Sequence, residues 1–177
     1  MPLMAASNHV RWGAIGFLLG GLVWVVSGLL IVFGSRIMGP HPVYFLLFVV
    51  ALLLTSAGLI GLHALQEGSY GLIGQVGLYT VLLAFALQAL GTVVLLSGSS
   101  AIVWLVSPVG ILVKLVGFVL YGVATLQAKV LPRWYGVALI TLVPFSVALL
   151  VYGNIWTGLV LLVLGYALWL RTGTPEA

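Results

Sequence analysis

The stretch Trp12-Gly-Ala-Ile-Gly-Phe-Leu-Leu-Gly-Gly-Leu-Val-Trp-Val-Val-Ser-Gly-Leu-Leu-Ile-Val-Phe33 runs for 22 residues without a charged side chain. A helix needs about 20 apolar residues to cross the hydrocarbon core of a bilayer. The apolar part of a cleavable secretory signal is shorter, about 7–15 residues. Strands of membrane barrels are also shorter and alternate apolar with polar residues. The stretch therefore predicts a membrane-spanning helix that is retained.

Five further apolar runs follow. The six predicted spans are residues 12–33, 43–65, 72–96, 102–128, 134–152 and 155–170. The predicted loops between them are 39–42, 66–71, 97–100 and 129–133, and a weaker break lies at 152–154. Prolines in the loops cannot donate a backbone hydrogen bond and restrict the residue before them. The sequence therefore predicts an all-α, polytopic transmembrane helical bundle in one domain, residues 1–177, although the last two short spans could instead form one bent re-entrant unit.

The composition excludes several classes of protein. Charged residues make up 5% of the 177 residues and hydrophobic residues 63%, whereas a soluble domain carries about 25% charged residues. The chain has no cysteine, and its two carboxylates, Glu67 and Glu176, lie outside the predicted spans. Paired carboxylates for glycoside hydrolysis are therefore missing. The six basic residues are scattered rather than clustered as in nucleic-acid binding. We expect neither an enzyme nor a nucleic-acid partner.

The basic residues predict an orientation. Six spans place both termini on one side of the membrane, and that side carries Arg11, Lys129, Arg133 and Arg171. The opposite side carries only Arg36. Because Lys and Arg accumulate in cytoplasmic loops, both termini are predicted to be cytoplasmic.

Two segments resemble each other. Gly61–Gln66 and Gly122–Gln127 share Gly, Leu and Gln at an offset of 61 residues. In addition, an Arg-Trp pair stands at the start of both the first and the fifth predicted spans, at residues 11–12 and 133–134. One explanation is three tandem helical hairpins that pair successive spans in the same orientation. The other is chance, because membrane helices draw on few residue types.

Glycines recur along the first predicted span. Gly16 and Gly20 form a G-x-x-x-G pair, and Gly13 and Gly28 continue the strip of small residues. Small residues allow close helix packing in lipid, where no hydrophobic force drives helices together. The strip indicates either an interface in a homo-oligomer or packing within one bundle.

Lys114 lies near the middle of the span 102–128. A charge at that depth costs about 2.5–3.5 kcal/mol on insertion scales and marks a candidate functional site. Counting from the loop that joins the two spans, Gln88 is predicted at a similar depth, where it would accept a hydrogen bond from the ammonium. Lys114 then contacts an anionic ligand, a lipid or a partner subunit. Alternatively, its stem extends along the helix to carry the charge to an interface.

His63 lies about one turn inside the end of the span 43–65. A neutral imidazole is an axial ligand for haem iron or chlorophyll magnesium, which would make His63 a cofactor-binding residue. Alternatively, His63 donates a hydrogen bond to a backbone carbonyl or to Gln127. The sequence does not identify a cofactor.

Leu131-Pro132-Arg133-Trp134 and Gly61-Leu62-His63-Ala64-Leu65-Gln66 carry a resemblance. Over roughly residues 50–170, the chain resembles a broad set of uncharacterised bacterial integral membrane proteins. These have about six helices and a Leu-Pro-Arg-Trp element before the fifth helix. The resemblance implies a bacterial cytoplasmic membrane location and supplies no catalytic residues, and Lys114 is not part of its pattern.

Three functions fit these observations. The first is a non-catalytic accessory or structural subunit of a larger bacterial membrane complex, or of a homo-oligomer. The second is a small transporter or channel. Its polar pathway would be lined by Ser56, Gln75, Gln88, Thr92 and Lys114. The third is a protein that binds a lipid, quinone or pigment between its helices.

Overall fold

The computed structural model describes residues 2–34, 42–96 and 100–172, which form six α-helices and two short helical turns. These are α1 (Pro2–Leu29), the π-helical turn η1 (Leu30–Gly34), α3 (Pro42–Gln66), α4 (Gly71–Leu96), α5 (Ser100–Ala128), α6 (Arg133–Ala148), the 3-10 turn η2 (Leu150–Tyr152) and α7 (Gly153–Thr172). The prediction of an all-α helical bundle is confirmed. The predicted loops at 39–42 and 97–100 lie largely outside the described residues.

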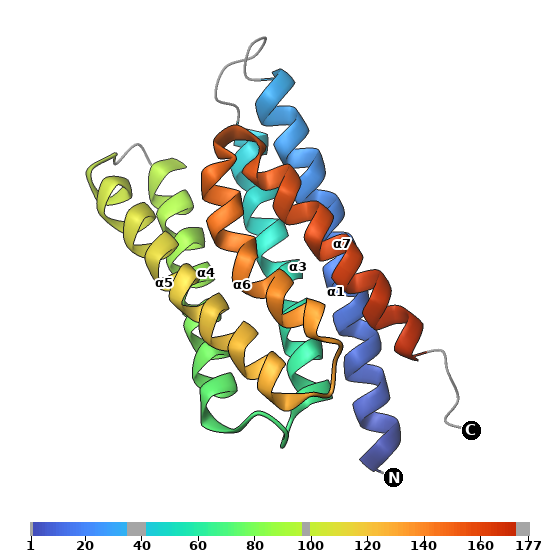
Figure 1. The fold of residues 1–177 in the computed structure, drawn as a ribbon. Coiled ribbons are helices and arrows are strands. Elements are labelled where there is room, and N and C mark those ends of the chain that lie inside the picture. The colour runs from blue at the N-terminus through green and yellow to red at the C-terminus, as the bar shows by residue number, and fades with distance from the viewer. Residues whose placement is uncertain (1, 35–41, 97–99, 173–177) are drawn as a thin grey trace.

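The helices form two triplets. In the first triplet α1 packs against α3 and α7, and in the second α5 packs against α4 and α6. The contacts between the triplets, α3 with α4 and α6 with α7, are much less extensive. Figure 1 shows α4 and α5 at one side of the bundle, α1 and α7 at the other, and both termini at the same end.

The triplets differ from three tandem hairpins. The pairs α1–α3 and α4–α5 pack closely, as a hairpin arrangement requires. However, α6 packs mainly on α5 and α7 mainly on α1, so the last pair is not a closely packed hairpin.

Glycines account for the close packing inside each triplet. A methyl group added at Gly13 would lie 2.5 Å from the Cα atom of Gly61, and one added at Gly21 would lie 2.8 Å from the carbonyl oxygen of Gly158. In the second triplet, a methyl group at Gly77 would lie 2.5 Å from the backbone nitrogen of Tyr121. Helices approach this closely only where a side chain is missing. The glycines of α1 therefore serve packing within the chain.

The outer surface of the bundle is apolar. Large hydrophobic side chains point outward from several helices, among them Leu46, Leu72 and Leu112, whose exposed fractions are 63%, 75% and 61%. A soluble monomer rarely exposes apolar patches of this extent. Within the described residues, five helices (α1, α3, α4, α5 and α7) are long and apolar enough to cross a membrane. The surface is therefore suited to lipid.

α6 ends earlier than the sequence predicts. The predicted span is 134–152, but the α-helix stops at Ala148 and the 3-10 turn η2 follows. Pro144 lies inside α6 and has no N–H to donate to the preceding turn. Leu150 then adopts a positive φ of 49°, a conformation that does not continue a right-handed helix. The chain therefore turns before the predicted break at 152–154, and α7 begins at Gly153.

Candidate functional site

A cavity of about 530 Å³ lies between the two triplets. We call it the Lys114 cavity. Tyr44 near the start of α3, Leu95 near the end of α4 and Asn154 near the start of α7 all lie in the half of the bundle away from the termini. The complete lining is Trp24, Ile31, Tyr44, Phe45, Phe48, Gln88, Gly91, Thr92, Leu95, Ile111, Lys114, Ser146, Val147, Leu150, Asn154 and Thr157. Both triplets thus contribute to one site.

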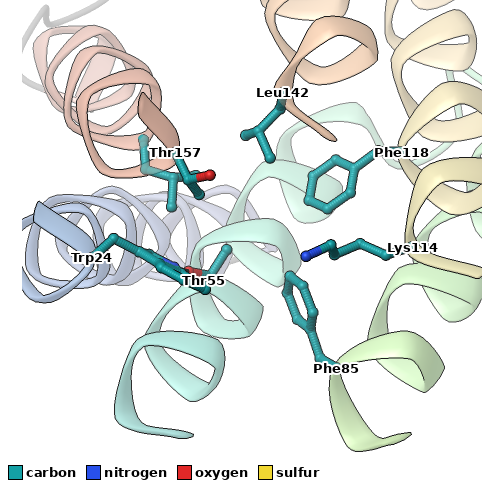
Figure 2. Close-up of a pocket in the computed structure, with 8 residues that line it drawn as sticks. Trp24, Thr55, Phe85, Lys114, Phe118, Leu142 and Thr157 are labelled. Atoms are coloured by element: carbon teal, nitrogen blue, oxygen red, sulfur yellow. Dashed lines mark hydrogen bonds between the residues drawn. The ribbon is translucent and has the colours of Figure 1, made fainter. Parts of the chain in front are cut away.

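Lys114 lies at the deep end of this cavity. It is the middle residue of α5, since Ser100 and Ala128 are each fourteen residues away. Figure 2 shows its side chain pointing from α5 into the bundle between Phe85 and Phe118. The side chain does not extend along its own helix toward an interface, so the explanation that its charge reaches an interface along the stem is wrong for this structure. The ammonium is presented to the interior of the site.

Gln88 shares the cavity with Lys114, as their predicted common depth requires. A methyl group added at Gly110, one turn before Lys114, would lie 3.0 Å from the Cγ atom of Gln88. The predicted hydrogen bond from the ammonium is wrong, because Oε1 of Gln88 is buried without a hydrogen-bond partner. A buried acceptor without a partner costs about 1–3 kcal/mol. Oε1 of Gln88 is thus enclosed by protein and does not contact the ammonium.

The positive charge of Lys114 has no counter-ion within the site. The chain contains two carboxylates, Glu67 and Glu176. Glu67 is exposed in the turn between α3 and α4, at the opposite end of the bundle from the cavity, and Glu176 lies outside the described residues. Among the described residues, none forms an ion pair or hydrogen bond with the ammonium. A charge in a low-dielectric interior is stabilised by an opposite charge, so the site is complementary to an anion.

Two threonine hydroxyl groups around the cavity already donate to their own helices. Thr92 Oγ1 donates to the carbonyl of Gln88 over 2.8 Å, and Thr157 Oγ1 donates to that of Gly153 over 2.9 Å. These hydrogen bonds leave lone pairs, rather than protons, for a bound molecule. Lys114 is therefore the main charged donor in the site.

One wall of the cavity is aromatic. Trp24 Nε1 donates a hydrogen bond to Thr55 Oγ1 over 3.1 Å, and Thr55 in turn donates to the carbonyl of Ala51 over 2.7 Å. The ring of Trp24 also meets Phe48 edge to face, with centroids 5.3 Å apart. These contacts join α1 to α3 and fix the wall before any molecule binds.

An apolar layer closes the deep end of the cavity. The layer consists of Phe85, Phe118, Leu142 and Leu161. Together with Trp24, Thr55, Lys114 and Thr157, these side chains line a void of about 10 Å³. The rings of Phe85 and Phe118 have centroids 6.1 Å apart. A space of this size is at the lower limit for one water molecule. Phe85, Phe118 and the two leucines therefore form an apolar layer beside Lys114.

The predicted polar pathway is partly wrong. Thr92 lines the cavity together with Gln88 and Lys114. Ser56 is not among the residues that line the cavity, and its hydroxyl donates to the carbonyl of Leu52 in its own helix over 2.8 Å. Gln75 is exposed near the start of α4, in the other half of the bundle.

Sequence reasoning missed several lining residues, including Trp24, Ser146, Asn154 and Thr157. Asn154 and Thr157 are three residues apart and therefore share one face of α7. This spacing was visible in the sequence. Which neighbour that face meets depends on the packing of α7, which the sequence did not indicate.

His63 lies away from the cavity, near the end of α3. Its ring centroid is 5.5 Å from that of Tyr70, and its Nδ1 atom is buried without a hydrogen-bond partner, as are Gln66 Nε2 and the Tyr70 hydroxyl. The alternative partner Gln127 is exposed. In the part of the chain that the structure describes, no three His, Cys, Asp or Glu side chains come together to hold a metal ion.

No known family, curated protein or solved structure matches this chain, so the geometry of the Lys114 cavity carries the functional argument.

Proposed function

We propose that the chain crosses the bacterial cytoplasmic membrane six times with both termini inside. Five helices have the length for a span. The 16 residues of α6 rise about 24 Å, most of a hydrocarbon core of about 30 Å, and the 3-10 turn η2 then connects α6 to α7. The start of α1 and the end of α7 lie at the same end of the bundle, which supports an even number of passes (Figure 1).

The basic residues support this orientation. Arg11 stacks over the ring of Trp169, 5.2 Å from its centroid, and Arg171 Nη1 donates to the carbonyl of Val130 over 3.1 Å. These contacts gather basic side chains at the end of the bundle that holds the termini, where the positive-inside rule expects the cytoplasm. The Lys114 cavity then lies in the half of the protein toward the outside.

The biochemical function that the geometry supports best is the transport of an anionic solute. The observation that carries it is a cavity of about 530 Å³, at whose deep end lies a lysine with no counter-ion among the described residues. The cavity lies at the interface between two triplets that contact each other sparingly. Transporters commonly bind substrate near the membrane midplane between two such units, which rock around the site. In this scheme the apolar layer of Phe85, Phe118, Leu142 and Leu161 holds the inner route shut.

Flux into proteoliposomes tests this function. The purified protein is reconstituted, and uptake of radiolabelled small anions is compared for the wild type, Lys114→Gln and Lys114→Arg. We expect Lys114→Gln to abolish saturable anion uptake and Lys114→Arg to retain part of it, because only arginine keeps the charge.

Lys129→Gln is the matched control, since Lys129 is exposed in the turn between α5 and α6. It removes the same charge from the chain but leaves the cavity untouched. Equal uptake by wild type and Lys114→Gln, with both proteins folded, would refute the proposed function.

A subunit role is the second candidate. A shallow apolar cavity of about 430 Å³ is lined by Val26, Leu29, Leu30, Phe33 and Gly34, where α1 passes into η1. A partner helix or a lipid chain would fill such a surface, and in either case the protein is non-catalytic. Gentle purification, followed by mass spectrometry and an absorption spectrum, distinguishes the candidates. A stoichiometric protein partner indicates an accessory subunit, and a visible band indicates a pigment binder.

The shared Gly-Leu-Gln pattern supports an origin by duplication of a hairpin. In that history, the third pair of helices would have repacked onto α1 and α5 after duplication.

A further inference from the structure

We infer that the solute is an amphipathic monoanion, namely a water-soluble monocarboxylate with an apolar body of several carbons. This inference rests on the proposed function and adds the chemical class of the solute. It places the carboxylate at Lys114 and the apolar body against the aromatic wall formed by Trp24, Phe45 and Phe48.

The single positive charge of Lys114 favours a solute that carries one negative charge. Lys114 is the one side chain with a formal charge among the residues that line the cavity. A monoanion neutralises it, whereas a dianion leaves a second negative charge in a low-dielectric site without a partner. A cation would meet a like charge. The cavity therefore disfavours dicarboxylates, phosphate dianions and amines.

The lining indicates that the solute carries an apolar body. Apolar side chains from both triplets, among them Phe45, Phe48, Leu95 and Ile111, make up much of the cavity. Chloride or acetate would leave most of 530 Å³ unfilled, since pockets of about 300–1,000 Å³ match molecules of drug size. Each methylene transferred from water to an apolar wall raises affinity about fourfold.

The neutral polar groups fit a carboxylate rather than a second charged group. Gln88 contributes an amide to the same cavity as Lys114, and Ser146 and Asn154 contribute neutral polar side chains from α6 and α7. A side-chain amide carries two N–H donors. The NH₂ group of Gln88 can therefore donate a hydrogen bond to a carboxylate oxygen.

Binding of a homologous series tests the inference. Acetate, butanoate and hexanoate are titrated against the full chain in nanodiscs of zwitterionic lipid, with empty nanodiscs as the background. We expect affinity to rise about fourfold per added methylene. Hexanoate should bind about tenfold to a hundredfold more tightly than uncharged hexanamide, because hydrogen bonds to charged groups are the strong ones. Adipate and hexylammonium should bind more weakly than hexanoate.

Two variants distinguish the contribution of the carboxylate to binding from that of the apolar chain. Lys114→Gln should remove the preference for hexanoate over hexanamide, and Phe45→Ala should flatten the dependence of affinity on chain length. Equal affinity for acetate and hexanoate, with Lys114 still required, would overturn the inference and leave the proposed function standing. Hexanoate binding that is unaffected by Lys114→Gln would overturn both.

Anionic lipid is the other source of such a head group, and the lipid composition decides between the two. Hexanoate affinity that is unchanged in nanodiscs containing phosphatidylglycerol supports a water-soluble solute. A competitive loss of hexanoate affinity in those nanodiscs would show a lipid head group at Lys114 and overturn the assignment.

Discussion

The hydrogen bond from Trp24 to Thr55 fixes the indole ring beside the cavity. Trp24 is 4% exposed and Thr55 is 2% exposed, so neither group has water as an alternative partner. The indole N–H has only this acceptor in the described residues. A buried donor that loses its acceptor bears the full cost of its desolvation.

Replacing Thr55 with valine tests this contact. Valine keeps the shape of threonine but removes the acceptor, so Thr55→Val should lower the free energy of unfolding by about 1–3 kcal/mol. Thr55→Ser keeps the hydroxyl and should recover most of that loss. Reversible unfolding in mixed micelles, monitored by tryptophan fluorescence, provides the measurement. Equal destabilisation by both substitutions would assign the effect to packing rather than to the hydrogen bond.

Lys114 and Gln88 were predictable because charged and amide side chains are rare in these spans and stand out in the sequence. Their common depth followed from counting residues out to the turn and back. The absence of a hydrogen bond between them was not predictable, because it depends on side-chain rotamers. Trp24 was counted simply as an apolar residue of the first span, since nothing in the sequence pairs it with Thr55.

Glycine decides how closely α4 and α5 approach. A methyl group at Gly77 would meet the backbone nitrogen of Tyr121 at 2.5 Å, and one at Gly117 would meet that of Val81 at 2.7 Å. Backbone atoms cannot move aside as a flexible side chain can. The two helices would therefore have to separate or rotate to admit even one carbon atom.

Gly77→Ala should accordingly lower stability by about 1–3 kcal/mol, the usual cost of overpacking. Alanine has the higher helix propensity, so the packing effect must overcome a gain from propensity. Ala86→Leu is the matched control, because Ala86 is on the exposed face of the same helix and should tolerate the larger residue. Mixed-micelle unfolding measures both variants, and a more stable Gly77→Ala protein would contradict the packing argument.

Helix positions were predicted well and helix partners were not. The predicted span 43–65 lies within one residue at each end of α3, Pro42–Gln66, because apolar runs and loop chemistry mark helix ends. The early end of α6 at Ala148 was missed because hydropathy continues unchanged past Pro144. Glycine strips indicated which faces pack, but not that α1 would contact α7 as well as α3.

At the scale of the whole molecule, the cavity combines side chains from both triplets at one end of the bundle. The chain has no native cysteine, so single cysteines report accessibility without background. Ser146→Cys and Asn154→Cys, which line the cavity, should react with a membrane-impermeant maleimide added to intact cells. Ser69→Cys, in the exposed turn between α3 and α4, should react only after the cells are made permeable.

The pattern of labelling tests both cavity and orientation. Hexanoate should slow the labelling of Ser146→Cys and Asn154→Cys but not that of Ser69→Cys. Labelling of Ser69→Cys in intact cells, with Ser146→Cys protected, would reverse the proposed orientation. Slow labelling of both cavity cysteines under all conditions would mean that the site is not reached from water.

The apolar layer below Lys114 is where the two halves of the proposed route meet. Phe118 contributes a ring that is 1% exposed to a layer formed by α4, α5, α6 and α7. Phe118→Ala removes that ring and leaves a cavity that only partly collapses, which would widen the void of about 10 Å³ beside Lys114. We therefore expect a butanoate leak through Phe118→Ala proteoliposomes that does not saturate.

Leu139→Ala, which truncates a fully buried side chain of α6 outside this layer, should reduce stability without a leak. If Phe118→Ala folds poorly, Phe118→Leu gives a smaller opening and an intermediate leak. A folded Phe118→Ala protein with no more leak than the wild type would show that some other part of the bundle closes the route.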